Sequence, residues 1–187
     1  MLILREVLNF SAAEVAETLD TTVAGVNSAL QRARHAIDEK RPEQSQQATL
    51  QAIGDDELRE LVEAYADAWE RGDVDTIVEM LTEDAAITMP PMATWFRGRD
   101  AVRTFLADFA FARTWDETEF VPGDRRVRLV QTSASGQPAF ASYRWGDGAF
   151  RPMAIQVLTF RDGRIDEIAG FVLPSLFPAF GLPAELP

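Results

Sequence analysis

The sequence predicts an α+β protein in which a small all-helical unit precedes a larger mixed domain. Two observations support this fold class. Apolar residues recur at helical spacing near the start of the chain and again after Asp55, whereas alternating, strand-like runs follow residue 125. Helices first and antiparallel strands afterwards are typical of α+β domains. We therefore expect a helix-turn-helix joined by a linker to an α+β domain with an antiparallel sheet.

The composition between these regions predicts the segment boundaries. Residues 39–54 have few apolar side chains, contain a proline and are rich in Gln, Ser and Glu, which is typical of a linker. We expect some helix at its end. The predicted segments are then the helical unit 1–38, the linker 39–54, the domain 55–173 and a tail 174–187. The tail has too much proline for a helix or a central strand, yet it is apolar enough to dock on a surface.

Three helices are predicted in the first segment. Residues 1–9 form the first, and its apolar side chains cover more than one face. Ser11 and Glu14 form a capping-box pattern, so a second helix begins at Ala12 and ends near Leu19. The third is capped by Thr21 or Thr22. Its predicted buried stripe consists of Val23, Val26, Leu30, Ala33 and Ile37.

The larger domain should begin with helices and end with strands. One helix runs from Asp55 to the Arg-Gly-Asp at 71–73, a shorter one reaches Leu81, and a third covers residues 98–109 with Phe109 among its inward residues. A short strand at 85–90 separates the last two helices. Four later strands are expected near 125–133, 138–145, 152–161 and 164–173. Asp162-Gly163 predicts a type I′ hairpin between the last two.

Composition excludes several kinds of site. The 187 residues contain no cysteine and one histidine, His35, so disulfides, thiolate zinc sites and cysteine nucleophiles are excluded. We expect no metal and no cofactor. The apolar start "MLILREVL" is too short for a signal peptide or a membrane span, so we expect a cytoplasmic protein without membrane partners.

The net charge of −12 argues against nucleic acid as a partner, but its distribution qualifies that argument. Residues 1–41 carry five basic and six acidic groups, so nearly all the excess acidity lies beyond them. Most of the positive charge of this opening stretch gathers at the end of the third predicted helix and just after it.

The third helix carries the side chains of a DNA reader. Amides and arginines lie off its buried stripe, and two short helices with such a second helix form the helix-turn-helix pattern. Asn and Gln suit adenine, and Arg suits guanine or phosphate. The alternative is a solvated helix face packed on a larger domain. The predicted DNA-binding residues are Thr22, Asn27, Ser28, Gln31, Arg32 and Arg34.

The stretch "LILREVLNFSAAEVAETLDTTVAGVNSALQRARHAI" resembles region 4 of sigma-70 family RNA polymerase sigma factors, in the extracytoplasmic-function group. The resemblance implies binding to the minus-35 promoter element and contact with the RNA polymerase core. The family's reading positions fall on Asn27, Ser28, Gln31 and Arg32, and Arg34 would meet phosphate. Many members carry Arg where this chain has Asn27, so the promoter sequence stays open.

Nothing in the sequence corresponds to region 2 of that family, and the chain opens inside the region 4 pattern. We therefore expect a fragment of a longer protein. The apolar residues of the first helix would then lose their natural cover. This predicts self-association through that helix.

The larger domain resembles the SnoaL-like, polyketide-cyclase-like branch of the nuclear-transport-factor-two superfamily. The stretches that carry the resemblance are "AYADAWERGDVDTIVEMLTEDAAITMPP", "WFRGRDAVRTFL" and "LTFRDGRIDEIAGF", over about residues 55–173. It implies a cone-shaped α+β barrel with a curved antiparallel sheet around a pocket. The segment "MPPMATWFRGRDAV" is similar to the version fused to some extracytoplasmic-function sigma factors.

A pocket for a small apolar ligand is the expected feature of this domain. Pairing across Asp162-Gly163 places Gln156, Phe160 and Glu167 on one mixed face, the expected cavity wall, and Trp95 is expected at the mouth. For each aromatic residue a packed core is the alternative. The predicted lining consists of Trp69, Met89, Trp95, Trp115, Tyr143, Gln156, Phe160 and Glu167.

Three functions remain open from the residues. The leading hypothesis is the C-terminal part of a sigma factor with a fused regulatory domain, without catalytic residues. The second is a cyclase or isomerase in which Glu167 has a raised pKa and acts as a base. The third is a ligand-responsive repressor, which requires a symmetric dimer.

Overall fold

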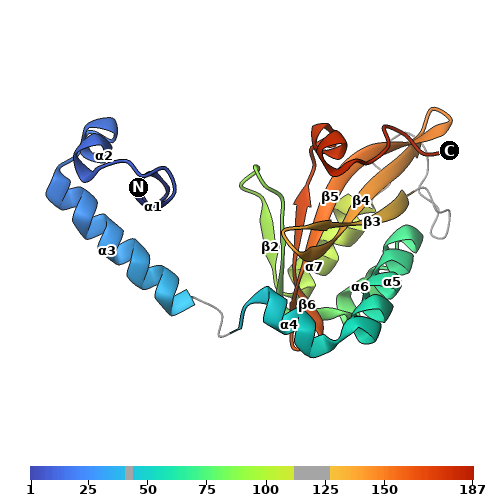
Figure 1. The fold of residues 1–187 in the computed structure, drawn as a ribbon. Helices are drawn as coiled ribbons and strands as arrows, with labels where there is room; N and C mark the ends of the chain where they lie inside the picture. Colours follow the sequence, from blue (N-terminus) through green and yellow to red (C-terminus); the bar gives the residue numbers. More distant parts are fainter. Residues whose placement is uncertain (41–43, 112–126) are drawn as a thin grey trace. The chain divides into compact units, whose positions relative to one another are not determined.

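The computed structural model describes residues 1–40, 44–111 and 127–187 and divides the chain into two compact units, Met1–Gln44 and Ser45–Pro187. The first is helical, and the second combines helices with a six-stranded sheet (Figure 1). The α+β fold class is thereby confirmed.

The first unit contains α1 (Leu2–Glu6), α2 (Ala12–Thr18) and α3 (Val23–Lys40). The predicted capping box begins α2: the Ser11 hydroxyl accepts from the Glu14 amide at 3.2 Å, and the Glu14 carboxylate accepts from the Ser11 amide at 2.7 Å. Hydrogen bonds from Ser11 lower the pKa of Glu14. Both donors would otherwise be unsatisfied at the helix start, so the box fixes where α2 begins.

The core of this unit is small. Val15 and Ala16 of α2 pack with Val26 of α3, and Leu30 is also buried. The predicted stripe is wrong at both ends, because the side chains of Val23 and Ile37 are 45% and 51% exposed. Since α1 and α2 are short, they cover only part of the long α3 helix.

The helices of the second unit are α4 (Gln46–Ile53), α5 (Asp55–Arg71), α6 (Val74–Glu79) and α7 (Arg99–Phe105). The predicted linker boundary at residue 54 therefore needs correction, because α4 packs with this unit. A π-helical turn, η1 (Leu106–Ala110), extends α7. Its wider spacing changes which side chains face inward, and Phe109, expected inside, is 49% exposed.

The sheet has the order β2-β1-β6-β5-β4-β3, and neighbouring strands are antiparallel except for β1 and β6. The predicted Asp162-Gly163 turn has positive φ at both residues, 52° and 70°, as a type I′ turn requires. The short strand β2 lay outside the sequence prediction. The strands are β1 (Leu81–Thr88), β2 (Trp95–Arg97), β3 (Val127–Ala134), β4 (Gln137–Gly146), β5 (Ala149–Arg161) and β6 (Arg164–Phe171).

Different segments of the chain pack on the two faces of the sheet. On the first, which we call the helical face, Phe140, Leu158 and Ile168 pack in one core with residues of α5, α6 and α7. On the second, the tail face, Tyr143 and Ile155 pack with the chain's C-terminal segment.

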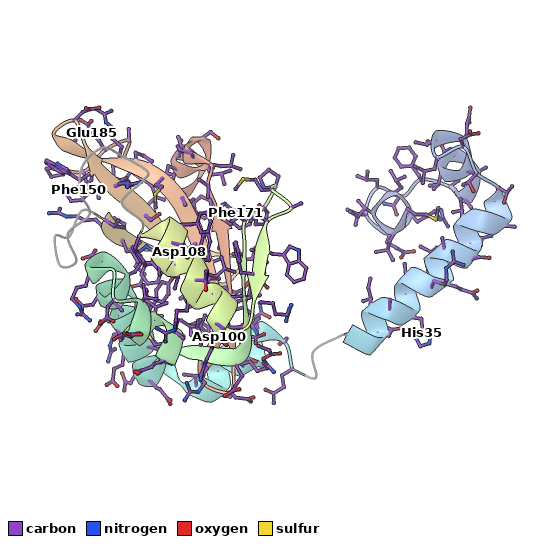
Figure 2. The ribbon with its side chains drawn as sticks, turned by 180° about the vertical axis from the view of Figure 1, so that it is seen from behind. His35, Asp100, Asp108, Phe150, Phe171 and Glu185 are labelled. Carbon is purple, nitrogen blue, oxygen red and sulfur yellow. The ribbon has the colours of Figure 1, made fainter. Side chains whose placement is uncertain are left out.

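The C-terminal tail docks, as its composition predicts, but it is partly helical. Pro174–Phe180 forms the 3₁₀-helix η3, which has Pro174 at its first position and Pro178 inside it. Phe177 is 1% exposed and its ring meets the Tyr143 ring edge-on at 5.1 Å. Further on, Phe150 and Leu186 exchange backbone hydrogen bonds of 2.9 Å, which is why Glu185 lies near Phe150 in Figure 2.

Candidate functional site

The exposed side of α3 is the first candidate site. Asn27, Ser28, Gln31 and Arg32 are all exposed, and their spacing of one and four residues places them on one side of the helix. Val26 and Leu30, on another side, are buried. The helix period thus separates a reading face, defined here as Asn27, Ser28, Gln31 and Arg32, from the side that holds the fold together.

The start of α3 is fixed by Thr22. Its hydroxyl accepts a hydrogen bond of 3.0 Å from the Gly25 amide. A Cβ at Gly25 would lie only 3.0 Å from the Thr21 hydroxyl oxygen and 3.2 Å from that of Thr22, so glycine lets the turn close. The Thr22 hydroxyl keeps its own proton, which it can donate to a partner such as a phosphate.

Arg34 differs from the reading face. Its guanidinium contacts the Glu6 carboxylate of α1 at 2.6 Å, with side chains 56% and 44% exposed. An ion pair this exposed stabilises a protein by about 1 kcal/mol or less. The predicted phosphate contact of Arg34 therefore competes with an internal partner that sequence analysis missed.

His35 lies beside these residues in the C-terminal half of α3 and is exposed (Figure 2). It is not among the reading positions.

The second candidate site is the helical face of the sheet. Three predicted lining residues, Trp69, Gln156 and Phe160, are buried on it. The Tyr65 hydroxyl donates to Gln156 Oε1 at 2.8 Å, and burial raises the pKa of Tyr65. The Tyr65 ring also lies 5.6 Å from that of Trp69. These side chains pack mainly on one another around one buried polar pair.

Glu167 is not on that face, which corrects the prediction. The hairpin register begins as expected, with Phe160 opposite Ile165, but a bulge then places Thr159 opposite Glu167. One extra residue in β6 moves every later side chain to the opposite face. Glu167 accepts a hydrogen bond of 2.8 Å from the Thr88 hydroxyl, and Ile168 takes the inward position instead.

Two further predicted residues, Tyr143 of the lining and Trp95 at the mouth, also lie away from the helical core. Tyr143 follows the alternation of β4 onto the tail face, where its hydroxyl donates to the Pro183 carbonyl at 2.9 Å. Trp95 pairs with Thr88 at the edge of the sheet and is 61% exposed, while its neighbour Phe96 packs toward the helices.

The remaining predicted lining residues are Met89 and Trp115. Met89 is half-buried, and its side chain lies beside Gly170. Because Gly170 pairs with Gln156, Met89 lies on the helical face. Trp115 lies outside the described residues.

A charged hollow of about 460 Å³ lies beside the start of β1 and was missed by sequence analysis. Arg161 is its centre: Nε donates to Asp166 at 2.9 Å, and a terminal nitrogen contacts Asp84. This hydrogen bond from Arg161 lowers the pKa of Asp84. The lining consists of Thr82, Glu83, Asp84, Arg99, Arg161, Asp162 and Arg164. Its opposite charges largely neutralise one another.

Two family descriptions match the chain. Residues 62–168 match "SnoaL-like domain", and residues 1–37 match "Sigma-70, region 4". The resemblances that the sequence suggested are thus confirmed in both parts of the chain.

Curated relatives match the whole chain. It is 36% identical over 186 residues to the ECF RNA polymerase sigma factor SigG of Mycobacterium tuberculosis, in strain CDC 1551 / Oshkosh and equally in strain ATCC 25618 / H37Rv. The match covers 100% of this chain and 47% of each relative. The chain thus spans about half the length of these relatives.

Solved structures are also similar. The extracytoplasmic function sigma factor SigJ of Mycobacterium tuberculosis has a TM-score of 0.45 and 25% identity, covering 98% of this chain and 60% of that one. An NTF-2 like protein of unknown function from Burkholderia xenovorans has a TM-score of 0.49 and 14% identity, covering 64% of this chain and 84% of that one.

Across the ranges 1–40, 44–111 and 127–187, no helix has the length and apolar character needed to cross a membrane.

Proposed function

Because the chain belongs to the SnoaL-like domain family and carries a sigma-70 region 4 ahead of that domain, we propose that it directs RNA polymerase to promoters as part of a sigma factor. In this proposal the region 4 unit binds the minus-35 element of promoter DNA and contacts the polymerase core. The SnoaL-like domain regulates that binding.

The exposed reading face of α3 carries the DNA-binding part of the proposal. A reading helix must present hydrogen-bonding side chains to base edges in the major groove. Asn27 and Gln31 supply amides, and Arg32 supplies a guanidinium for guanine or phosphate. Thr22 and Arg34 flank this face and would contact the DNA backbone.

The tail supports a regulatory role for the second unit. It is anchored by Phe177 and by the backbone pairing of Leu186 with Phe150, so it belongs to the folded domain. In a full-length relative that retains this arrangement, deleting residues from Pro174 onward should change transcription output. Unchanged output would remove the tail from the mechanism.

A ligand, if the domain binds one as part of its regulation, belongs on the helical face. Trp69, Phe160 and Met89 are the apolar side chains there and Gln156 carries an amide, but Trp69, Phe160 and Gln156 are buried, so a ligand would have to displace part of this packing. Such a ligand can shift regulation only by binding one state of the protein better than another. Tyr143, Glu167 and Trp95 are not part of this proposal.

The same geometry supports a non-enzymatic role. Glu167, the candidate base of the enzyme hypothesis, projects from the face opposite Gln156. A base there cannot act together with the Tyr65–Gln156 pair on one substrate.

We further propose that the isolated chain self-associates through α1. Ile3 of α1 and Val7 and Leu8, which directly follow this helix, are 63%, 65% and 56% exposed, so apolar surface gathers at the start of the chain. Sedimentation should show a concentration-dependent dimer that Val7→Glu abolishes. A monodisperse monomer at high concentration would refute self-association.

Selection from a random duplex library tests the proposed function. The purified chain should enrich one short motif, and the double variant Asn27→Ala/Gln31→Ala should lose that enrichment while keeping weak, salt-sensitive binding. Equal enrichment by both proteins would place sequence reading elsewhere, and no duplex binding at all would contradict the proposal.

A further inference from the structure

The helix α4 lies outside both family matches, between residues 37 and 62. It begins immediately after the short segment that separates α3 from the second unit. An eight-residue helix is marginal on its own in water, so contacts with its surroundings must hold it.

Gln46, the first residue of α4, makes the most specific of these contacts. Its side-chain Nε2 donates to the Phe160 carbonyl at 2.8 Å, and its Oε1 accepts from the Phe160 amide at 2.9 Å. A residue on a neighbouring antiparallel strand exchanges the same two bonds with its partner. The Gln46 amide thus imitates a strand.

The sheet needs such a partner at this point. The pairing of β4 with β5 extends only as far as Ala139 opposite Val157, because Pro138 has no amide proton to continue it. Beyond that pair, the Gln137 side chain donates a hydrogen bond to Thr159 Oγ1 at 3.0 Å. The Gln46 side chain makes the hydrogen bonds to the Phe160 backbone. Both amides lie beside the bulge that determines which face Glu167 occupies.

Apolar contacts complete the attachment. Leu50 and Ile53 of α4 are partly buried against the core of the helical face. At its other end α4 meets α5 at Gly54, whose φ of 86° and ψ of 154° are a conformation essentially reserved for glycine.

We propose that Gln46 is a latch that fixes where the DNA-reading unit is tethered to the SnoaL-like domain. With the latch closed, the tether is limited to the residues between α3 and α4. With the latch open, α4 frays and the tether extends toward Gly54.

This inference rests on the proposed function only for its purpose, since the latch supplies the coupling that regulation of DNA binding needs. Because the latch joins the tether to the bulged strand β5, a change in the sheet at Phe160 would reach the tether directly.

Hydrogen exchange and distance measurements on matched variants test the latch. Gln46→Ala removes both hydrogen bonds. Gln46→Glu keeps an acceptor for the Phe160 amide but loses the donor to its carbonyl. Gln47→Ala is the control, because Gln47 is the next residue of the same helix, is exposed, and its side chain makes no hydrogen bond to the described residues.

Exchange at the α4 amides and at the Phe160 amide should be about tenfold or more faster in Gln46→Ala, given the typical strength of two neutral hydrogen bonds. Gln46→Glu should fall between this variant and the wild type. Gln47→Ala should change by less than about twofold. Unchanged exchange in Gln46→Ala would overturn the latch.

The tether is measured separately. The chain has no cysteine, so Ala36→Cys on α3 and Glu57→Cys on α5, both exposed, can carry a pair of spin labels. Gln46→Ala should broaden the distance distribution between them, and Gln47→Ala should not. Faster α4 exchange with an unchanged distribution would overturn the tether role. Promoter binding assayed on the same samples distinguishes failure of the proposed function, because exchange and distances do not depend on DNA.

Discussion

The two units of this chain differ in how their polar side chains relate to their cores. In the first, Val15, Ala16 and Val26 form a minimal core, and the polar face of α3 remains exposed. In the second, an extensive core extends from α5 to β6, and its predicted functional residues are either packed inside it or excluded from it.

This difference shows where each unit can act. The first unit has a small core and keeps the polar side chains of α3 exposed, as the proposed recognition of DNA requires. The second is stabilised by burial, and its polar groups form internal bonds such as Tyr65–Gln156 or the Arg161 network. This difference supports the proposed division of roles, in which the first unit recognises DNA and the second regulates that binding.

The largest expected effect comes from the core of the second unit. Phe140 is 2% exposed and its ring lies 5.5 Å from that of Tyr65. Phe140→Ala should lower the free energy of unfolding of this unit by about 3–5 kcal/mol, because it leaves a cavity. Denaturant unfolding followed by hydrogen exchange should show that α3 amides are unaffected. Equal loss of protection in both units would mean that they unfold as one body.

A smaller effect is expected at the start of α2. Ser11→Ala removes the hydroxyl of the capping box and should destabilise the first unit by about 1 kcal/mol. Exchange at α2 amides measures the change, and Ser175→Ala, at an exposed tail position, is the control. Protection in α2 that survives unchanged would show that the box does not determine the stability of the unit.

The ion pair between α1 and α3 should contribute still less to stability, about 1 kcal/mol or below. Glu6→Gln breaks it and frees Arg34, so duplex affinity should rise by roughly twofold to threefold at low salt while stability hardly changes. Fluorescence anisotropy measures this affinity. A decrease in affinity would show that the pair positions α3 for binding.

The smallest effect concerns Asp84 in the second unit. Arg161 lowers the pKa of this carboxylate, so the ion pair is intact at neutral pH and is lost only as pH falls through the depressed value. Carboxyl NMR should place its midpoint below the usual value of about 3.9, and Arg161→Ala should raise the midpoint toward that value. An unaltered midpoint in that variant would exclude Arg161 as the cause.

The sequence was most informative where local rules suffice. Helical period separated Asn27 and Arg32 from Val26, the capping box located α2, and Asp162-Gly163 located the hairpin. The bulge after that hairpin has no comparable signal, since any residue of β6 could be the extra one. This bulge placed Glu167 on the face opposite to the predicted one. Hydrogen bonds between residues distant in sequence, such as those of Gln46 with Phe160, also could not be predicted from the sequence.

Duplex binding by variants of the reading face tests the central claim most directly. The duplex is the motif selected by the wild-type chain, and affinity is measured by anisotropy at one fixed salt concentration. Arg32→Ala should weaken binding by about tenfold to a hundredfold, the typical cost of one base or phosphate contact. Arg59→Ala, an exposed arginine of the second unit, should leave affinity unchanged. Equal affinities for Arg32→Ala and the wild type, or a loss confined to Arg59→Ala, would contradict the assignment of DNA recognition to α3.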